Sequence, residues 1–164
     1  MIVKIKTFNK ECMPTILKKG DWIDLRAAAD ITIKGPSLNS NGNLKINYTC
    51  IPLGVAMELP KGFEAQVAPR SSTFKSFGLL QYNSLGIIDN CYNGDNDEWK
   101  FPAIAFRDTT IKKGERICQF RIQLSQKATI WQKIKWLFSK SVKLKMVYEL
   151  NNVDRNGFGS TGKR

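Results

Sequence analysis

The sequence predicts an all-β domain made of many short strands, arranged as a sandwich or jelly roll. Several segments alternate apolar and polar residues with a period of two, and turns that contain Gly or Asn separate them. The length also fits, because 164 residues with 42% hydrophobic side chains suffice for one core. We find no repeat, no linker and no regular alternation of helices with strands, so a βαβ fold is not expected.

Four segments show the alternation most clearly, and each is interpreted as a half-buried strand. Within them, apolar residues alternate with mostly polar or charged ones, as expected when one face of a sheet packs on a core. The segments are Leu44 to Cys50, Phe63 to Val67, Phe120 to Leu124 and Leu144 to Leu150. Turns are predicted at Asn41-Gly42, Lys61-Gly62 and Lys113-Gly114.

One stretch, at about residues 130–140, has the spacing of a short basic amphipathic helix. One face carries Ile130, Ile134 and Leu137, and another carries Lys133, Trp136 and Lys140. Two interpretations stay open. The helix is a connector that docks its apolar face on the β domain, or its lysines and an exposed Trp136 contact nucleic acid, a membrane surface or a partner protein.

Composition excludes several classes of site. The chain has no histidine, which rules out a Ser-His-Asp triad, a Cys-His dyad and any zinc centre with histidine ligands. An acid–base catalyst must therefore be a carboxylate, lysine, tyrosine or cysteine. The four cysteines lack CxxC spacing and are expected to be buried or incidental thiols.

Charge and hydropathy indicate where the protein works and what it attracts. The net charge of +12 favours polyanions, whether nucleic acid or polyphosphate, although many lysines are expected to form only a solvated surface. The longest apolar runs are too short to span a bilayer, and the start of the chain lacks the apolar segment of a signal peptide. We expect a cytoplasmic protein, in the host cell if the gene is viral.

Three segments stand out before any family is considered. Ala68 to Thr73 places an arginine and hydroxyls at the end of a predicted strand, where they can grip phosphate oxygens. Asn83 to Gly94 contains an apolar strand that ends in Asp89, a carboxylate that either polarises a water or simply forms a turn. Gly114 to Gln119 is a glycine turn that leads into a strand.

The tail from Asn151 to Arg164 is polar and rich in glycine, and is expected to be a mobile arm after a β domain of residues 1–150. It is either a frayed terminus or an arm that orders over a phosphorylated ligand. The second role would use a charge, a ring and two hydroxyls, namely Arg155, Phe158, Ser160 and Thr161.

Taken together and in order, five segments closely resemble the motifs of the trimeric dUTPase family. They are Asp24 to Ala27, Pro69 to Ser72, Gly86 to Gly94, Gly114 to Gln119 and Gly157 to Gly162. The resemblance implies a homotrimer of jelly-roll (β-clip) subunits that hydrolyses dUTP to dUMP and pyrophosphate. This activity limits uracil incorporation into DNA and supplies dUMP for dTMP synthesis.

The resemblance also implies roles for individual residues. Asp89 matches the aspartate that activates the attacking water at the α-phosphorus. The phosphate chain would be held by Arg70, Ser71, Ser72 and Gln119. Mg²⁺ would be held by the three phosphates and by water, with Asp24 touching those waters and no direct protein ligand.

Base and sugar recognition are assigned in the same way. Asn83 and the backbone around Ile87 and Ile88 would read uracil, and Tyr92 would pack under deoxyribose. The arm would close over the site through Arg155, Phe158, Gly159, Ser160 and Thr161. The family's sites lie between subunits, and its arm reaches a neighbour's site.

This chain departs from the family pattern in three places. Only Asn156 and Gly157 separate Arg155 from Phe158, so the arm is short. The loop Asp95 to Trp99 is longer and acidic, and we expect Glu98 or Trp99 to line the site. The helix at residues 130–140 is not part of the common fold.

Two other functions are the alternatives to dUTP hydrolysis. One is the related dCTP deaminase activity, which needs a catalytic glutamate just after the hairpin, in a pattern this sequence lacks. The other is a scaffold kept for binding or regulation, against which Asp89, Tyr92 and Phe158 argue.

Overall fold

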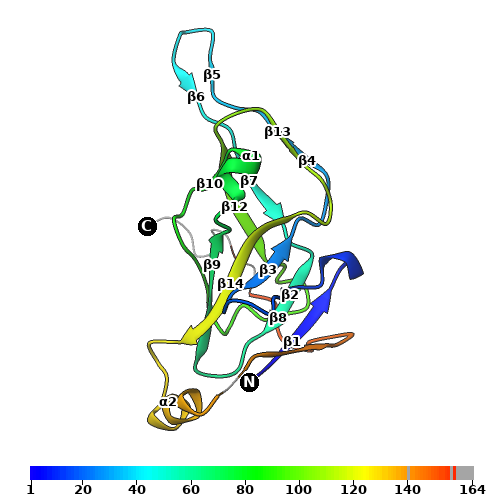
Figure 1. The fold of residues 1–164 in the computed structure, drawn as a ribbon, viewed down its shortest axis with the longest axis vertical. Helices are drawn as coiled ribbons and strands as arrows, with labels where there is room; N and C mark the ends of the chain where they lie inside the picture. The colour runs from blue at the N-terminus through cyan, green and yellow to red at the C-terminus, as the bar shows by residue number, and fades with distance from the viewer. Residues whose placement is uncertain (140, 156, 158–164) are drawn as a thin grey trace.

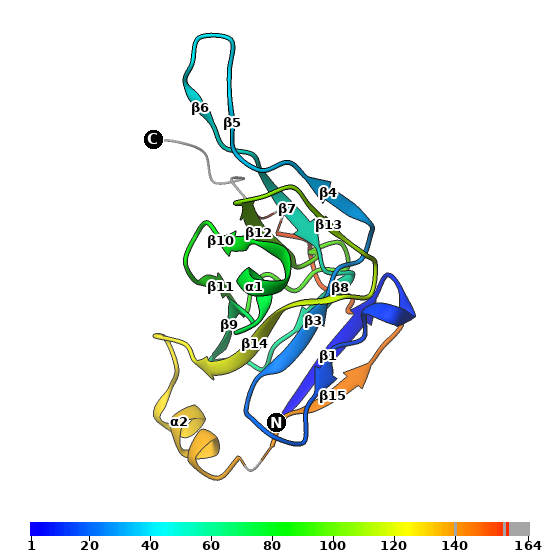
Figure 2. The same ribbon diagram turned by 45° about the horizontal axis from the view of Figure 1, so that its top comes forward.

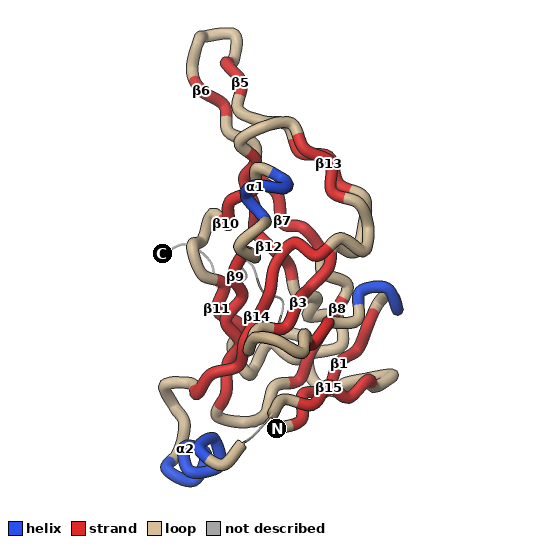
Figure 3. The backbone as a smooth tube through the Cα atoms, viewed as in Figure 1, coloured by secondary structure: helices blue, strands red, loops and turns tan. Residues whose placement is uncertain are grey.

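The computed structural model describes residues 1–139, 141–155 and 157 and shows an almost entirely β structure (Figures 1 and 3). The elements in chain order are β1 (Ile2–Thr7), η1 (Lys10–Cys12), β2 (Thr15–Ile16), β3 (Ile23–Arg26), β4 (Ile31–Ile33), β5 (Ser37–Leu38), β6 (Leu44–Lys45), β7 (Tyr48–Pro52), β8 (Val55–Glu58), β9 (Phe63–Pro69), α1 (Thr73–Phe77), β10 (Leu79–Gln81), β11 (Gly86–Ile88), β12 (Lys100–Ala105), β13 (Thr109–Ile111), β14 (Arg116–Leu124), α2 (Ile130–Leu137) and β15 (Lys143–Met146). The predicted all-β class is confirmed.

Three sheets form the body of the subunit. A five-stranded sheet has the order β11-β9-β14-β3-β2, and two three-stranded sheets have the orders β15-β1-β8 and β10-β12-β7. The pairing of β1 with β15 is parallel, and the other pairings of these sheets are antiparallel. The β5–β6 hairpin projects from one end of the subunit and α2 from the other (Figure 2).

The core lies between the sheets and is filled by inward residues of the alternating strands. On β9 these are Phe63, Ala65 and Val67, each at most 2% exposed. Phe120 of β14 packs edge-on against Trp99, with ring centroids 5.2 Å apart, and both side chains are fully buried. Trp99 therefore belongs to the core, and the expectation that it lines the substrate site is wrong.

Two of the four predicted strands differ from expectation. Leu44 to Cys50 is split between β6 and β7, and its apolar residues Leu44 and Tyr48 are 65% and 74% exposed. The last strand ends at Met146, and Tyr148 beyond it is 90% exposed. Alternation located these segments, but only part of each apolar face is covered: Leu144 packs against the core and Leu150 is 5% exposed, whereas among the described residues Tyr48 meets only the edge of Tyr82.

The helix predicted at residues 130–140 is present as α2, but its orientation is the reverse of expectation. A capping box formed by Thr129 and Gln132 starts it, and Trp136 packs against Phe63 with ring centroids 5.6 Å apart. The Gln132 amide also donates to the Lys61 carbonyl at 3.0 Å. The apolar residues expected to dock are exposed instead: Ile130 64%, Trp131 76%, Ile134 37%, Leu137 79% and Phe138 80%.

The remaining sequence expectations about the chain as a whole can also be compared with the structure. No helix among the residues the structure describes is long and apolar enough to cross a membrane. The four cysteines are free thiols, with Cys12 and Cys118 buried, Cys50 partly buried and Cys91 exposed. The predicted burial is confirmed for Cys12 and Cys118.

We predict that Trp99→Ala destabilises the protein by about 3–5 kcal/mol, because it removes a fully buried aromatic ring from beside Phe120. The shift is measured by urea unfolding at one fixed protein concentration. The matched control is Trp131→Ala, which removes a 76% exposed ring and should change stability by no more than about 0.5 kcal/mol. Equal effects of the two changes would contradict the assignment of Trp99 to the core.

Candidate active site

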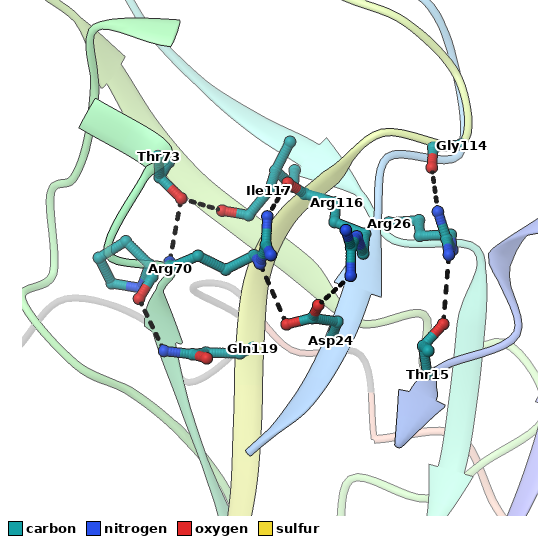
Figure 4. Close-up of polar contacts among 10 residues, drawn as sticks. Thr15, Asp24, Arg26, Arg70, Thr73, Gly114, Arg116, Ile117 and Gln119 are labelled. Atoms are coloured by element: carbon teal, nitrogen blue, oxygen red, sulfur yellow. Dashed lines mark hydrogen bonds and ion pairs between the residues drawn. The ribbon is translucent and has the colours of Figure 1, made fainter. Parts of the chain in front are cut away.

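A buried carboxylate held between two arginines forms the centre of the first half of the site (Figure 4). Asp24 Oδ1 accepts a bond from Arg70 Nε at 3.1 Å, and Asp24 Oδ2 accepts one from Arg116 Nη1 at 3.0 Å. The Asp24 side chain is 2% exposed, whereas those of Arg70 and Arg116 are 23% and 38% exposed. We call these three residues the arginine cluster; it presents two fixed guanidinium groups toward solvent.

Adjacent strands bring these residues together from distant parts of the chain. Gln119 of β14 pairs with Asp24 of β3 on one side and with Ala68 of β9 on the other. The register of β14 against β3 shifts between Arg116 and Cys118, at a bulge. The first, second and fourth motifs of the sequence therefore meet at one end of the five-stranded sheet.

The loop after β9 is fixed to β14 by a buried threonine. Thr73 Oγ1 accepts the backbone N–H of Arg70 at 3.0 Å and donates to the carbonyl of Ile117 at 2.8 Å. Ser71 is exposed, and Ser72 is the N-cap residue of α1 with its side chain making no capping bond. Both predicted phosphate-binding hydroxyls thus lie beside the arginine cluster.

The same end of the sheet contains two further polar features. Gln119 is half-buried and its amide donates to the carbonyl of Pro69 at 3.3 Å. Burial, followed by the charge of Asp24, raises the pKa of the Cys118 thiol well above its ordinary value. Cys118 is therefore a neutral core residue beneath the cluster and carries no negative charge into a site suited to anions.

The second half of the site is the hairpin Asn83 to Tyr92, which leads from β10 into β11. Its turn contains Ser84 at φ 61°, a left-handed conformation that is uncommon for residues other than glycine. The buried Gln81 amide donates to the Asn83 side-chain oxygen at 2.8 Å and to the Val67 carbonyl at 3.2 Å. Gln81 thereby fixes the position of Asn83, the residue predicted to read uracil.

Asp89 directly follows β11, as the sequence predicted, and its side chain is 55% exposed. Its backbone carbonyl accepts a bond from Tyr92 at 3.0 Å, so the residue also starts a turn. Asn90 fastens this turn by donating to the Leu59 carbonyl at 2.6 Å. Ile87 is 49% exposed and Ile88 half-buried, so the strand edge before Asp89 is accessible.

Tyr92 is half-buried, and its hydroxyl donates to the Glu98 carbonyl at 3.0 Å. Burial, with a smaller contribution from the charge of Asp97, raises the pKa of Tyr92 to about 12. The hydroxyl is thus a neutral donor and the ring a fixed apolar wall. Glu98 accepts the backbone N–H of Gly54 at 2.9 Å, so its carboxylate is engaged in the body and the expectation that it lines the site is not supported.

The first described residues of the arm return to the hairpin of their own chain. Arg155 Nη1 lies 3.0 Å from Asp89 Oδ2, and this bond raises the pKa of the Arg155 guanidinium. The predicted arm residues Phe158, Gly159, Ser160 and Thr161, and Lys140 after α2, lie outside the described residues. Their predicted roles stay predictions.

The two halves of the site are far apart within one chain. Ile88 of β11 pairs with Ala65 of β9, so Asp89 lies beside Glu64, whereas Arg70 follows the other end of β9. At roughly 3.3 Å per residue, this separates Asp89 from Arg70 by about 20 Å. A single subunit cannot bring the predicted water-activating carboxylate to the predicted phosphate ligands.

Asp24, the residue expected to contact metal-bound water, has both carboxylate oxygens engaged in this structure. Both of its oxygens are bonded to guanidinium groups and its side chain is 2% exposed, so it fits the role of holding Arg70 and Arg116 better than that of meeting Mg²⁺. Within the described part of the chain, no group of three or more Cys, Asp or Glu side chains is placed to hold a metal ion.

Sequence reasoning overlooked three residues that shape the site, namely Arg116, Thr73 and Gln81. Arg116 lies in the segment Gly114 to Gln119 and Thr73 in the segment Ala68 to Thr73, but no role was predicted for either residue. Gln81 gave a weak signal, because it is a polar residue at an inward position of a short strand, 7% exposed. A buried polar side chain needs a bonding partner, and that requirement is the signal that could have found Gln81 and Thr73.

We predict that Thr73→Val destabilises the protein by about 1–3 kcal/mol, because the Arg70 N–H and the Ile117 carbonyl lose their buried partner while the shape of the side chain is nearly kept. Urea unfolding at fixed concentration measures the change. Thr73→Ser keeps the hydroxyl and is the control. If the serine and valine variants were equally unstable, the methyl group rather than the two hydrogen bonds would be the important part of Thr73.

Comparison with known proteins agrees with this geometry. The model of the dUTPase family matches residues 23–162. The SPbeta prophage-derived deoxyuridine 5'-triphosphate nucleotidohydrolase YosS of Bacillus subtilis (strain 168) is 49% identical over 165 residues, covering 100% of both chains. The deoxyuridine 5'-triphosphate nucleotidohydrolase of Finegoldia magna is 32% identical over 171 residues, covering 98% of this chain and 99% of the relative.

Solved structures share the fold at lower identity. The dUTPase from Streptococcus mutans has a TM-score of 0.62 at 19% identity, with 74% of this chain and 94% of that chain covered. The dUTPase of Staphylococcus bacteriophage 80alpha has a TM-score of 0.62 at 18% identity, with 78% and 93% covered. The jelly-roll-like fold is therefore shown, and the family match over most of the chain together with the full-length relative establishes that this chain belongs to the dUTPase family.

Proposed function

We propose that this protein hydrolyses dUTP to dUMP and pyrophosphate. The observation that carries the proposal is the arginine cluster, in which a buried Asp24 fixes two partly exposed guanidinium groups near Gln119. Ser71 directly follows Arg70 in the chain. Fixed guanidinium groups and hydroxyls match the oxygens of a polyphosphate chain in charge and geometry. The curated relatives of this family carry the name deoxyuridine 5'-triphosphate nucleotidohydrolase.

The active site is shared between subunits of a homotrimer. Support comes from the separation of about 20 Å between Asp89 and Arg70 along β9, which a second subunit must bridge. Support also comes from the sheet β10-β12-β7, where Leu80, Ile104 and Tyr48 are direct cross-strand neighbours on one face. Leu80 is 41% and Tyr48 74% exposed, an apolar row that an adjacent subunit would cover.

In the proposed reaction Asp89 accepts the proton of a water that attacks the α-phosphorus, and pyrophosphate leaves. Arg70, with Ser71, Ser72 and Gln119, holds the phosphates, and Arg116 adds a second guanidinium group. Asn83 and the exposed edge at Ile87 and Ile88 read uracil, while the ring of Tyr92 supports the sugar. Arg155 leaves Asp89 and meets the γ-phosphate, and Phe158, Gly159, Ser160 and Thr161 complete the closed arm.

Mg²⁺ is the proposed cofactor, bound by the triphosphate. When bound, it neutralises charge on the phosphates and on the leaving pyrophosphate. The 3D structure of a D95N mutant dUTPase from phage phi11 of S. aureus reveals the coordination of a structural Mg(II) ion in that protein. For this chain we propose that Asp24 positions Arg70 and Arg116. A contact between Asp24 and metal-bound water would require a different conformation of the arginine cluster.

We predict rapid release of pyrophosphate from dUTP, and at least a hundredfold slower release from dTTP, dCTP and UTP, with Mg²⁺ present. Asp89→Asn should lower kcat by about a hundredfold or more, because general-base assistance contributes that much. The control is Asp108→Asn, which changes an exposed carboxylate paired with Lys34. Deamination of dCTP would show the related activity instead, and a well-folded trimer with no turnover would mean that the scaffold serves binding.

A second proposal concerns α2, whose exposed face favours an anionic membrane surface. Trp136 is not exposed between lysines, as a nucleic-acid site would need, but rests on Phe63. The opposite face is apolar and ends in Leu137 and Phe138, 79% and 80% exposed. Residues 125–145 contain six lysines and no acidic residue, and a basic helix with an aromatic apolar face is typical of helices that lie in a lipid interface.

We predict that the protein sediments with vesicles containing about one third anionic lipid and not with neutral vesicles. Trp131→Ser with Leu137→Ser should lower this partition about tenfold or more, since two apolar side chains stay in water. Lys133→Gln with Lys135→Gln should lower it similarly. If only the lysine pair mattered and duplex DNA competed, the surface would be a nucleic-acid site; equal partition of all variants would exclude a contact role.

We place the protein in the cytoplasm.

A further inference from the structure

Gln81 is a polar residue at an inward position of the short strand β10. Leu79 on the same face is fully buried, and Gln81 is itself only 7% exposed. Its amide nitrogen Nε2 donates to two acceptors, the backbone carbonyl of Val67 on β9 at 3.2 Å and the Asn83 side-chain oxygen at 2.8 Å. Gln81 thus connects β9 with the first residue of the hairpin.

These two hydrogen bonds fix the orientation of both side-chain amides. A backbone carbonyl only accepts hydrogen bonds, so the Gln81 atom that faces Val67 must be the nitrogen. That nitrogen only donates, so the Asn83 atom bonded to it must be the oxygen. Asn83 is exposed, and its amide nitrogen Nδ2 is therefore the group that it presents to a ligand.

The neighbouring strand leaves room for this arrangement. Gly86 of β11 pairs with Val67 of β9. A Cβ on Gly86 would lie 3.2 Å from Gln81 Nε2 and 3.2 Å from Val67 Cβ, which is tighter than most real contacts of a Cβ atom. Because Gly86 has no side chain, the Gln81 amide can lie against Val67 and still reach Asn83.

Stability alone does not explain an amide at this position. Gln81 Oε1 is buried, and no group in the described part of the chain donates to it. A buried acceptor without a donor costs stability, and an apolar side chain of similar size would avoid that cost. The advantage of glutamine therefore lies in the two bonds of its nitrogen, and one of them ends on a residue of the proposed base site.

We propose that Gln81 sets the discrimination between uracil and cytosine by holding the Asn83 amide with its donor outward. This inference rests on the proposed dUTP hydrolysis, in which Asn83 reads the base. Uracil, like thymine, carries an oxygen acceptor at C4, where cytosine carries an amino donor. Asn83 Nδ2 bonds the oxygen of uracil but meets a second donor in cytosine, which leaves both groups unpaired. Gln81 acts through Asn83 and is therefore a positioning residue.

The test compares the selectivity of the wild-type protein with that of Gln81→Met. Methionine has a volume similar to that of glutamine but donates no hydrogen bond. Pyrophosphate release from dUTP, dCTP and dTTP is measured for the full-length protein with Mg²⁺. Without the Gln81 donor, the Asn83 amide rotates and offers its oxygen to the cytosine amine, so the ratio of kcat/KM for dUTP over dCTP should fall about tenfold or more.

Thymine provides an internal control for a loosened hairpin. It has the hydrogen-bonding groups of uracil and differs by one methyl group, so the ratio of kcat/KM for dUTP over dTTP should stay within about twofold of the wild-type value. An equal fall of both ratios would overturn the inference, because it would show a purely structural role. Gln123→Met, which removes the amide of a half-buried glutamine bonded to Gln66, should leave both ratios unchanged.

A double-mutant comparison tests whether Gln81 acts through Asn83. Asn83→Asp presents an oxygen whichever way its side chain turns, because its two carboxylate oxygens are equivalent. In the Asn83→Asp background, adding Gln81→Met should therefore leave the ratio for dUTP over dCTP unchanged. An equal fall in both backgrounds would show that Gln81 does not act by orienting Asn83. Gln81→Leu carries the same expectations and replaces Gln81→Met if that variant is unfolded.

Failure of this inference is distinguishable from failure of the proposed function. If the wild-type protein releases pyrophosphate from no nucleotide, the proposed function fails, and calorimetric binding of dUMP and dCMP then gives the selectivity ratio. If dUTP is hydrolysed but Gln81→Met keeps the wild-type ratio for dUTP over dCTP, only the role of Gln81 fails.

Discussion

The length of one strand separates the two halves of this active site. β9 carries the hairpin with Asp89 along one end and Arg70 at the other, and a strand of seven residues cannot be bent to bring them together. In the proposed function the chemistry is therefore assembled between subunits. The exposed apolar row on the β10-β12-β7 sheet is consistent with this constraint.

Within the phosphate half, a buried charge determines the geometry. Asp24 is almost inaccessible, and an ionised carboxylate in such a place is stable only with paired and hydrogen-bonded partners. Arg70 and Arg116 satisfy it from two neighbouring segments and are held rigid in return. Thr73 adds a second fixed point by joining the loop after β9 to β14. A polyphosphate would meet preformed donors, with little ordering left to do.

Two features lie outside the common pattern of the family: an acidic loop and the basic helix α2. The loop Gly94 to Glu98 is acidic, and its carboxylates are bonded to the backbone N–H groups of Leu150, Arg155 and Gly54 and to Lys6. α2 is basic and engaged on one side only, through Trp136 and Gln132. The helix is capped and packed on one side, but its aromatic and aliphatic face is exposed to water. An exposed apolar face of this kind is typical of an interaction surface.

The sequence by itself determined the strands of the core, the turn at Asp89 and the types of residue available for catalysis. Alternation located Phe63 to Val67 and Phe120 to Leu124, since a period of two follows from strand geometry alone. The absence of histidine restricted an acid–base catalyst to a carboxylate, lysine, tyrosine or cysteine. Tertiary structure decided that Trp99 fills the core, that Trp136 rather than Ile134 faces the body, and that Asp24 pairs with two arginines. Local periodicity shows which face of a strand or helix is apolar. The residues that this face contacts depend on the register between strands that are distant in sequence.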